Sequence, residues 1–437
     1  MFPMHANMPH LHLPVPVIEG KDYFCTTCKH RDPRPSAMAF SARYPVWLPA
    51  APKPTALAFA ILFTIESLAR ASVATVVSVQ AYDLLQSSQK VSQLFTAVGI
   101  VSLIGTLVVP LIIGRTARRF VYTFGALCLI MAAAAFAAHT LLGQTIGMLI
   151  RVFGTACLNI TTSLYILDHI RRQDLVRAEP MRLTFSTLSW TIGPALGVWL
   201  YTRYGVWAPQ VFSVFWTLVL LALFWYLRLS ESRIIQPARV NKPGNPLRSV
   251  WRFAAQPRLR LAWLIAFGRS CFWSLFFIYA PLLMITSGLG KEAGGLLVSA
   301  GNAVLIFAMA FGKLSERFTI RRVIAFAFGV IGVSTITAGL AGIEYPYMAA
   351  LMLFIAAIGA TAVDGVGGLP FMRAVRYHQR AEMAGVYRTY VDIAELIPTF
   401  IYSILLIFLP LGSVFVAMGA WGLVCGLIAW HYLPRSM

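Results

Sequence analysis

The chain has 437 residues, of which 58% are hydrophobic and 12% are charged, and its mean hydropathy is +0.72. A soluble domain carries about 25% charged residues, so this chain has too little polar surface to cover a water-exposed globule. Lipid is therefore the expected solvent for much of it. The net charge of +20 would suggest nucleic-acid binding in a soluble protein. Here the basic residues gather in short loops between apolar runs, as the positive-inside rule predicts, and we expect no nucleic-acid partner.

The first apolar run is preceded by a polar, proline-rich extension over residues 1–54, for which we expect a disordered cytoplasmic segment. It contains no apolar core typical of a cleavable signal peptide, so the first transmembrane helix must direct its own insertion. Cys25 and Cys28 have the spacing of half a zinc site, which the nearby histidines would complete. The alternatives are a tail that binds no metal or an extension from a wrongly chosen start, and we expect no metal centre.

Twelve apolar stretches are about as long as the 20 residues that a membrane-spanning helix needs. They cover residues 56–80, 91–114, 120–139, 144–168, 184–204, 208–229, 261–284, 293–313, 322–342, 346–369, 382–408 and 411–432.

The loops between these stretches alternate between basic and nearly non-basic. This pattern puts both termini of a twelve-helix chain on the cytoplasmic side. The longest loop, residues 230–260, is rich in arginine and proline and reads as a cytoplasmic linker, with a short interfacial helix at its WRFAA segment. We therefore predict an all-α integral membrane protein of twelve transmembrane helices in two pseudo-symmetric six-helix bundles, residues 55–229 and 261–437.

The two halves show traces of an internal repeat. Positions in one half match positions in the other at separations of 203 to 205 residues. The matched pairs are Glu66 with Arg269, Gly154 with Gly359, Asn159 with Asp364, and Pro194 with Pro398.

Over residues 55–433 the chain resembles the major facilitator superfamily. The family's loop motif G-x-L-A-D-R-x-G-R-R is similar to PLIIGRTARR at 110–119, where the basic positions are kept and a glycine, Gly114, replaces the acid. The second copy keeps its acid. The positions that carry this resemblance are Arg115, Arg118 and Arg119 in the first copy, and Gly312, Glu316, Arg317 and Arg321 in the second.

Two further motifs support the resemblance. Arg151 and Gly154 match the family's helix 4 motif, and Gly193-Pro194-Ala195-Leu196-Gly197 matches the G-P-x-x-G of helix 5. In this family the helix 5 motif is associated with drug–proton antiporters. The resemblance implies that helices 1, 4, 7 and 10 line a central cavity and that the glycines and Pro194 serve conformational change.

Ionisable side chains inside a membrane are costly unless they are paired or hydrated, so each is a candidate functional residue. Glu66 and Arg70 are four residues apart and can pair along one helix face. Asp364 lies within reach of a long arginine side chain, and at about 100° per residue the three charges of helix 11 share one face. The eight candidates for substrate or proton coupling are Glu66, Arg70, Arg151, Arg269, Asp364, Arg388, Asp392 and Glu395. The alternative is that these charges only fix helix packing.

We expect a secondary active transporter of small solutes in the inner or plasma membrane, most simply a monomer that expels its substrate in exchange for protons. A carboxylate in a dry cavity can load and release protons near neutral pH. The sequence contains no G-x-x-x-x-G-K-[ST] signature of ATP use, and we expect neither a cofactor nor an enzyme activity. Two alternatives remain open: uptake of an organic anion held by arginine side chains, and a non-transporting membrane partner or sensor with the same fold.

Overall fold

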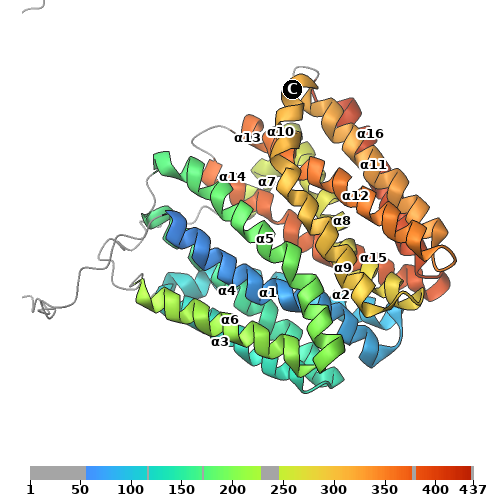
Figure 1. Ribbon diagram of the computed structural model, residues 1–437. Coiled ribbons are helices and arrows are strands. Elements are labelled where there is room, and N and C mark those ends of the chain that lie inside the picture. Colours follow the sequence, from blue (N-terminus) through green and yellow to red (C-terminus); the bar gives the residue numbers. More distant parts are fainter. Residues whose placement is uncertain (1–55, 116–117, 170–171, 228–245, 376–379, 435–437) are drawn as a thin grey trace, which may run out of the picture. The chain divides into compact units, whose positions relative to one another are not determined.

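The computed structural model describes residues 56–115, 118–169, 172–227, 246–375 and 380–434, and helices account for most of them (Figure 1). The predicted extension at residues 1–54, with Cys25 and Cys28, lies outside this part of the chain. So does most of the predicted linker. Within the described part, no group of three or more metal-ligating side chains could hold a metal ion.

The N-terminal helices run from α1 to α6, and short turns join most of them. Helix α1 packs against α5 and α6, while α3 packs against α4 and α6. Gly205 closes α5 with a φ of +95°, a left-handed conformation that glycine adopts without steric cost. The bounds of these helices are Ala56–Leu85 (α1), Ser88–Arg115 (α2), Arg118–Ala137 (α3), Leu141–His169 (α4), Arg172–Tyr204 (α5) and Trp207–Tyr226 (α6).

The C-terminal helices run from α8 to α16, after a short helix α7 that covers most of the WRFAA segment, as predicted. Helix α11 packs between α12 and α16, and α8 contacts α9, α12, α15 and α16. Their bounds are Pro246–Ala254 (α7), Pro257–Thr286 (α8), Gly290–Ala303 (α9), Val304–Phe307 (the 3₁₀ turn η1), Ala308–Arg317 (α10), Ile320–Ala341 (α11), Pro346–Val366 (α12), Leu369–Ala374 (α13), Arg380–Arg388 (α14), Tyr390–Phe408 (α15) and Gly412–Tyr432 (α16).

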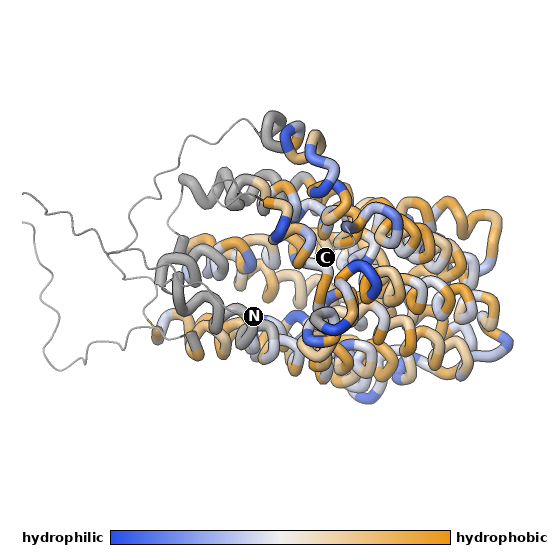
Figure 2. Tube along the Cα trace, turned by 90° about the horizontal axis from the view of Figure 1, so that it is seen from above, coloured by the Kyte–Doolittle hydropathy of each residue, from blue (hydrophilic) through white to orange (hydrophobic). Residues whose placement is uncertain are grey.

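Ten helical stretches in the described part of the chain are long and apolar enough to cross a membrane. Apolar residues predominate along the helices in Figure 2. Large apolar side chains also lie on the surface: Phe326 and Leu340 are each 75% exposed. Such a surface is unfavourable in water and favourable in lipid. The chain is therefore a multi-pass membrane protein.

The structure corrects the sequence prediction at three places. The basic segment 168–182 was expected to be a loop, but α4 continues to His169 and α5 begins at Arg172. Its Arg, Gln, Leu and Ala residues favour helix, so the helices extend beyond the apolar stretches. The eighth apolar stretch is interrupted by η1, and the eleventh is interrupted at Thr389, whose amide bonds to the carbonyl oxygen of Val386 instead of continuing the α-helical pattern.

Candidate functional site

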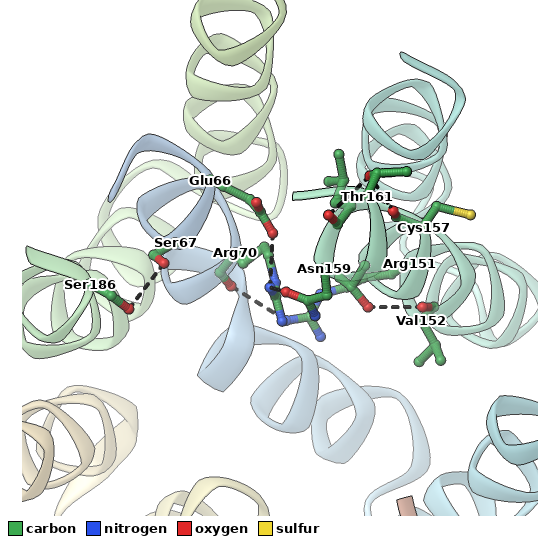
Figure 3. Close-up of polar contacts among 11 residues, drawn as sticks. Glu66, Ser67, Arg70, Arg151, Val152, Cys157, Asn159, Thr161 and Ser186 are labelled. Carbon is green, nitrogen blue, oxygen red and sulfur yellow. Dashed lines mark hydrogen bonds and ion pairs between the residues drawn. The ribbon is translucent and has the colours of Figure 1, made fainter. Parts of the chain in front are cut away.

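Four polar side chains from α1 and α4 form what we call the N-terminal cluster (Figure 3). Arg70 lies one turn after Glu66 on α1, and its guanidinium Nη1 lies 3.1 Å from the Glu66 carboxylate, which confirms the predicted pair. The same nitrogen donates to Asn159 Oδ1 on α4 at 3.2 Å. Arg151, also on α4, donates from Nη2 to the backbone carbonyl of Arg70 at 3.4 Å. These bonds join α1 and α4 through two guanidinium groups, those of Arg70 and Arg151.

The N-terminal cluster is buried unevenly. The Glu66 side chain is fully buried, whereas that of Arg70 is 19% exposed. With Arg151 counted, the cluster holds two guanidinium groups and one carboxylate. Inside a membrane such an excess of positive charge requires a counter-charge nearby.

The C-terminal cluster is built on α8 and α12, with one residue from α15. Arg269 forms an ion pair with Asp364, which was predicted to lie within reach of an arginine. The second carboxylate oxygen of Asp364 accepts a hydrogen bond from the Trp273 indole at 2.8 Å. Arg269 also donates to the Tyr390 hydroxyl at 3.3 Å and lies 5.5 Å from the centre of that ring. The Arg269–Asp364 pair therefore carries no net charge and has further polar partners.

One charge from the C-terminal helices acts on the N-terminal cluster. Glu395 on α15 interacts electrostatically with Arg151 and Arg70, and also with Asp392. Its exposed side chain is therefore near the arginines of α1 and α4. Arg388 is exposed at the end of α14, before the interruption at Thr389. Asp392 and Glu395 lie on α15, after that interruption, so the single face predicted for Arg388, Asp392 and Glu395 spans two helices and stays a prediction.

The G-P-x-x-G motif lies where α5 meets α1 and α9. A Cβ on Gly197 would lie 1.7 Å from the carbonyl oxygen of Ser72, and a Cβ on Gly193 would lie 2.6 Å from the Cβ of Ala71. Next to Pro194, the amide of Ala195 donates to Ser299 Oγ on α9 at 2.8 Å. The motif therefore permits close helix packing at this junction, whatever the direction of transport.

The other motif residues contribute to local packing. A Cβ on Gly154 would lie 2.8 Å from the carbonyl oxygen of Gly125, which accounts for glycine where α3 and α4 approach. Arg119 lies over the Phe120 ring at 4.9 Å, and Arg321 lies over Trp430 at 4.8 Å. Gly312 and Arg317 are on α10, and Arg317 is exposed. The side chains of Arg115, Arg118 and Glu316 lie outside the described part of the structure.

An inter-helix network that the sequence did not predict lies at the ends of α1, α5 and α9, and we call it the Asp83 network. Asp83 Oδ2 accepts hydrogen bonds from Tyr201 Oη on α5 and from Lys291 Nζ on α9, each at 2.6 Å. Lys291 lies 5.2 Å from the Tyr201 ring centre, and Thr202 donates to Glu292 at 2.7 Å. The network joins N-terminal helices to a C-terminal helix at one end of the bundle.

Membrane helices with buried guanidinium–carboxylate pairs define a polytopic helical protein with the polar interior that transporters use. A family model described as the Major Facilitator Superfamily matches residues 59–399. The chain therefore belongs to this superfamily of membrane transporters. No curated protein sequence matches it.

Solved transporter structures share the fold at low sequence identity. A D-xylose–proton symporter matches with a TM-score of 0.70 and 13% identity, over 87% of this chain and 98% of the symporter. A peptide transporter POT matches with a TM-score of 0.68 and 14% identity, over 87% and 94% of the two chains. A nucleoside transporter, NupG, matches with a TM-score of 0.64 and 13% identity, over 86% and 98%.

Proposed function

We propose that this protein is a proton-coupled secondary transporter of a small polar solute that works by alternating access. In this proposal α1–α6 and α8–α16 form two halves of six membrane spans each, twelve in all. The predicted linker, residues 230–260, would join them on the cytoplasmic side of the inner or plasma membrane, where both termini would also lie. The protein would act as a monomer, and the two halves would rock around a site near the membrane midplane.

The observation that carries the proposal is the fully buried Glu66 carboxylate, bonded to Arg70 within a cluster that has more guanidinium groups than carboxylates. A carboxylate that gains and loses contact with a guanidinium binds protons with a conformation-dependent affinity. Proton binding then favours one conformation over the other, which is the thermodynamic requirement for coupling. Asp364 with Arg269 is the equivalent candidate among the C-terminal helices.

The Asp83 network supports alternating access because it joins the proposed halves by charged side chains at one end of α1, α5 and α9. We propose that this end faces away from the cytoplasm and must separate during each cycle. Cysteines at positions 83 and 291, joined by a short thiol-specific cross-linker, are expected to stop transport. Reduction of a cleavable cross-linker should restore it, and each single-cysteine variant serves as a control. Undiminished transport by the cross-linked protein would contradict the proposal.

The direction of transport has two candidates. The similarity to a D-xylose–proton symporter favours uptake with protons, whereas the G-P-x-x-G motif favours efflux in exchange for protons. Since the motif is accounted for by packing against α1, symport is the better-supported direction. A thermal-shift screen of small solutes on purified protein would supply a ligand. Liposomes with a pH gradient of either sign then separate the two directions, because accumulation follows proton entry in symport and opposes it in antiport.

The positive N-terminal cluster favours a solute that carries a negative group, such as a carboxylate. Arg70 and Arg151 would bind it in the position where Glu395 now supplies the counter-charge. An organic anion should therefore stabilise the protein in the screen more than its methyl ester. A non-transporting partner or sensor of the same fold predicts no flux for any ligand found, and flux in the liposome assay would exclude it.

A further inference from the structure

A groove of about 380 Å³ lies between α5 and α9, beside the Asp83 network. The lining positions on α5 recur every three or four residues, so they form a single helix face. The two lining positions on α9 are one helical turn apart. The lining residues are Ile192, Ala195, Leu196 and Trp199 on α5, with Glu292 and Leu296 on α9. From Ile192 to Trp199 the groove follows α5 for roughly 10 Å at 1.5 Å per residue.

The groove is apolar along its length and acidic at one end. Ile192, Trp199 and Leu296 are 49%, 45% and 61% exposed, as expected for side chains in contact with lipid. Glu292 lies in the first turn of α9 and accepts a hydrogen bond from Thr202 at 2.7 Å. Lys291, the neighbouring cation, is already paired with Asp83. The carboxylate therefore keeps acceptor capacity at the end of an apolar channel.

Aromatic residues place the acidic end of the groove near the membrane surface. Trp199 contacts Tyr204 at 5.6 Å between ring centres, and Trp207 at the start of α6 is 57% exposed. Tryptophan and tyrosine concentrate at the level of lipid headgroups. The groove thus runs from headgroup level toward the hydrocarbon core.

We propose that this groove binds one phospholipid with a primary amine headgroup, such as phosphatidylethanolamine. The acyl chain would lie along α5 over Leu196 and Ile192, and the ammonium would donate to the Glu292 carboxylate. A primary ammonium has N–H donors for this bond, whereas a choline headgroup has none and an anionic headgroup is repelled. Helices α5 and α9 belong to different halves in the proposed function, and the Asp83 network joins them. A lipid that contacts both helices therefore stabilises the conformation in which the two halves are joined. The site depends on membrane insertion and is independent of the transported solute.

The test is lipid retention by the full-length protein, measured by native mass spectrometry after extraction from vesicles that contain equal amounts of phosphatidylethanolamine and phosphatidylcholine. The wild type is expected to retain phosphatidylethanolamine preferentially. Glu292→Gln should lower that preference about tenfold, the loss of one charge-assisted hydrogen bond. Glu344→Gln is the matched control, because Glu344 is also an exposed acid, lies in the turn before α12 and does not line the groove.

A second variant tests the apolar part of the site. Leu296→Trp should fill the groove and reduce retention of both lipids, while the exposed position of Leu296 leaves folding intact. Equal retention of the two lipids by the wild type would overturn the proposal. So would an undiminished preference in Glu292→Gln, even if the protein transports normally.

Discussion

The N-terminal and C-terminal clusters both place arginine side chains among membrane helices, but they balance the positive charge differently. In each cluster an arginine on one helix bonds to an acceptor on another helix: Arg70 to Asn159, and Arg269 to Asp364. The two acceptors are matched positions of the internal repeat. The acceptor is a neutral amide in the first cluster and a carboxylate in the second. The C-terminal pair balances its own charge, whereas the N-terminal cluster relies on Glu66 from its own helix and still holds a second guanidinium.

From this difference we propose a transport role for the N-terminal cluster and a mainly structural role for the C-terminal pair, which remains the second candidate for coupling. A neutral pair with additional bonds from Trp273 and Tyr390 can persist unchanged through a conformational cycle. A cluster with an unbalanced positive charge must find its counter-charge outside itself, in Glu395 or in a bound anion. We therefore expect solute and proton binding to depend more on the N-terminal cluster.

The largest effect is expected for Glu66→Gln. The glutamine keeps the size of the side chain but leaves the Arg70 guanidinium without its bonded carboxylate. We expect a loss of stability of about 3 kcal/mol, as for a broken buried ion pair, measured by thermal unfolding in detergent. Accumulation driven by a pH gradient should be abolished, while solute exchange across liposomes without a gradient continues. Glu344→Gln is the control for the loss of one acid, and normal gradient-driven accumulation by Glu66→Gln would remove Glu66 from the coupling mechanism.

Asp364→Asn should have the second-largest effect. It makes the C-terminal acceptor an amide, like Asn159, and leaves Arg269 with the Tyr390 hydroxyl and the Ser270 hydroxyl. The side chains of Arg269 and Asp364 are 22% and 17% exposed. We therefore expect a loss of stability of about 2 kcal/mol, below the value for fully buried pairs. Exchange and gradient-driven transport should fall together, since a packing defect affects every step. A selective loss of proton coupling would instead give Asp364 the role proposed here for Glu66.

The sequence predicted the elements that follow from local spacing. The Glu66–Arg70 pair required only a separation of four residues on one helix, and the pairing of Asp364 required only its estimated depth. The apolar stretches gave the helices because hydrocarbon fixes their length. These predictions needed no knowledge of how the helices pack.

The partners contributed by distant helices were missed because they depend on packing. Asn159 was recognised only as a repeat match, and Trp273 gave no sign that its indole bonds to a carboxylate. Asp83 and Lys291 lie at the ends of α1 and α9, in segments that the sequence predicts to be loops poor in basic residues. The interruption at Thr389 involves neither glycine nor proline, the residues that usually mark one in a sequence.

Asn159→Asp reverses the comparison by giving the N-terminal cluster the acceptor of the C-terminal one. The new carboxylate would lie beside Arg70, where Asn159 Oδ1 is now 3.2 Å from the guanidinium. We expect stability to increase by about 1 kcal/mol and an anionic solute to bind several-fold more weakly, because the excess positive charge is removed. Thermal unfolding and ligand titration measure the two effects. Tighter binding of the anion would show that the charge of this cluster does not attract the solute.

Trp273→Phe should have the smallest effect and sharpens the assignment of the C-terminal cluster. It removes one hydrogen bond to Asp364, worth about 1 kcal/mol, and keeps an aromatic ring beside Phe272, Phe276 and Phe277. A double-mutant cycle separates this bond from packing. We expect the effect of Trp273→Phe to disappear in an Asp364→Asn background and to persist in a Glu66→Gln background, as measured by thermal unfolding. Coupling of Trp273 to Glu66 instead would mean that the two clusters act as one unit, and the division of roles argued from their charges would be wrong.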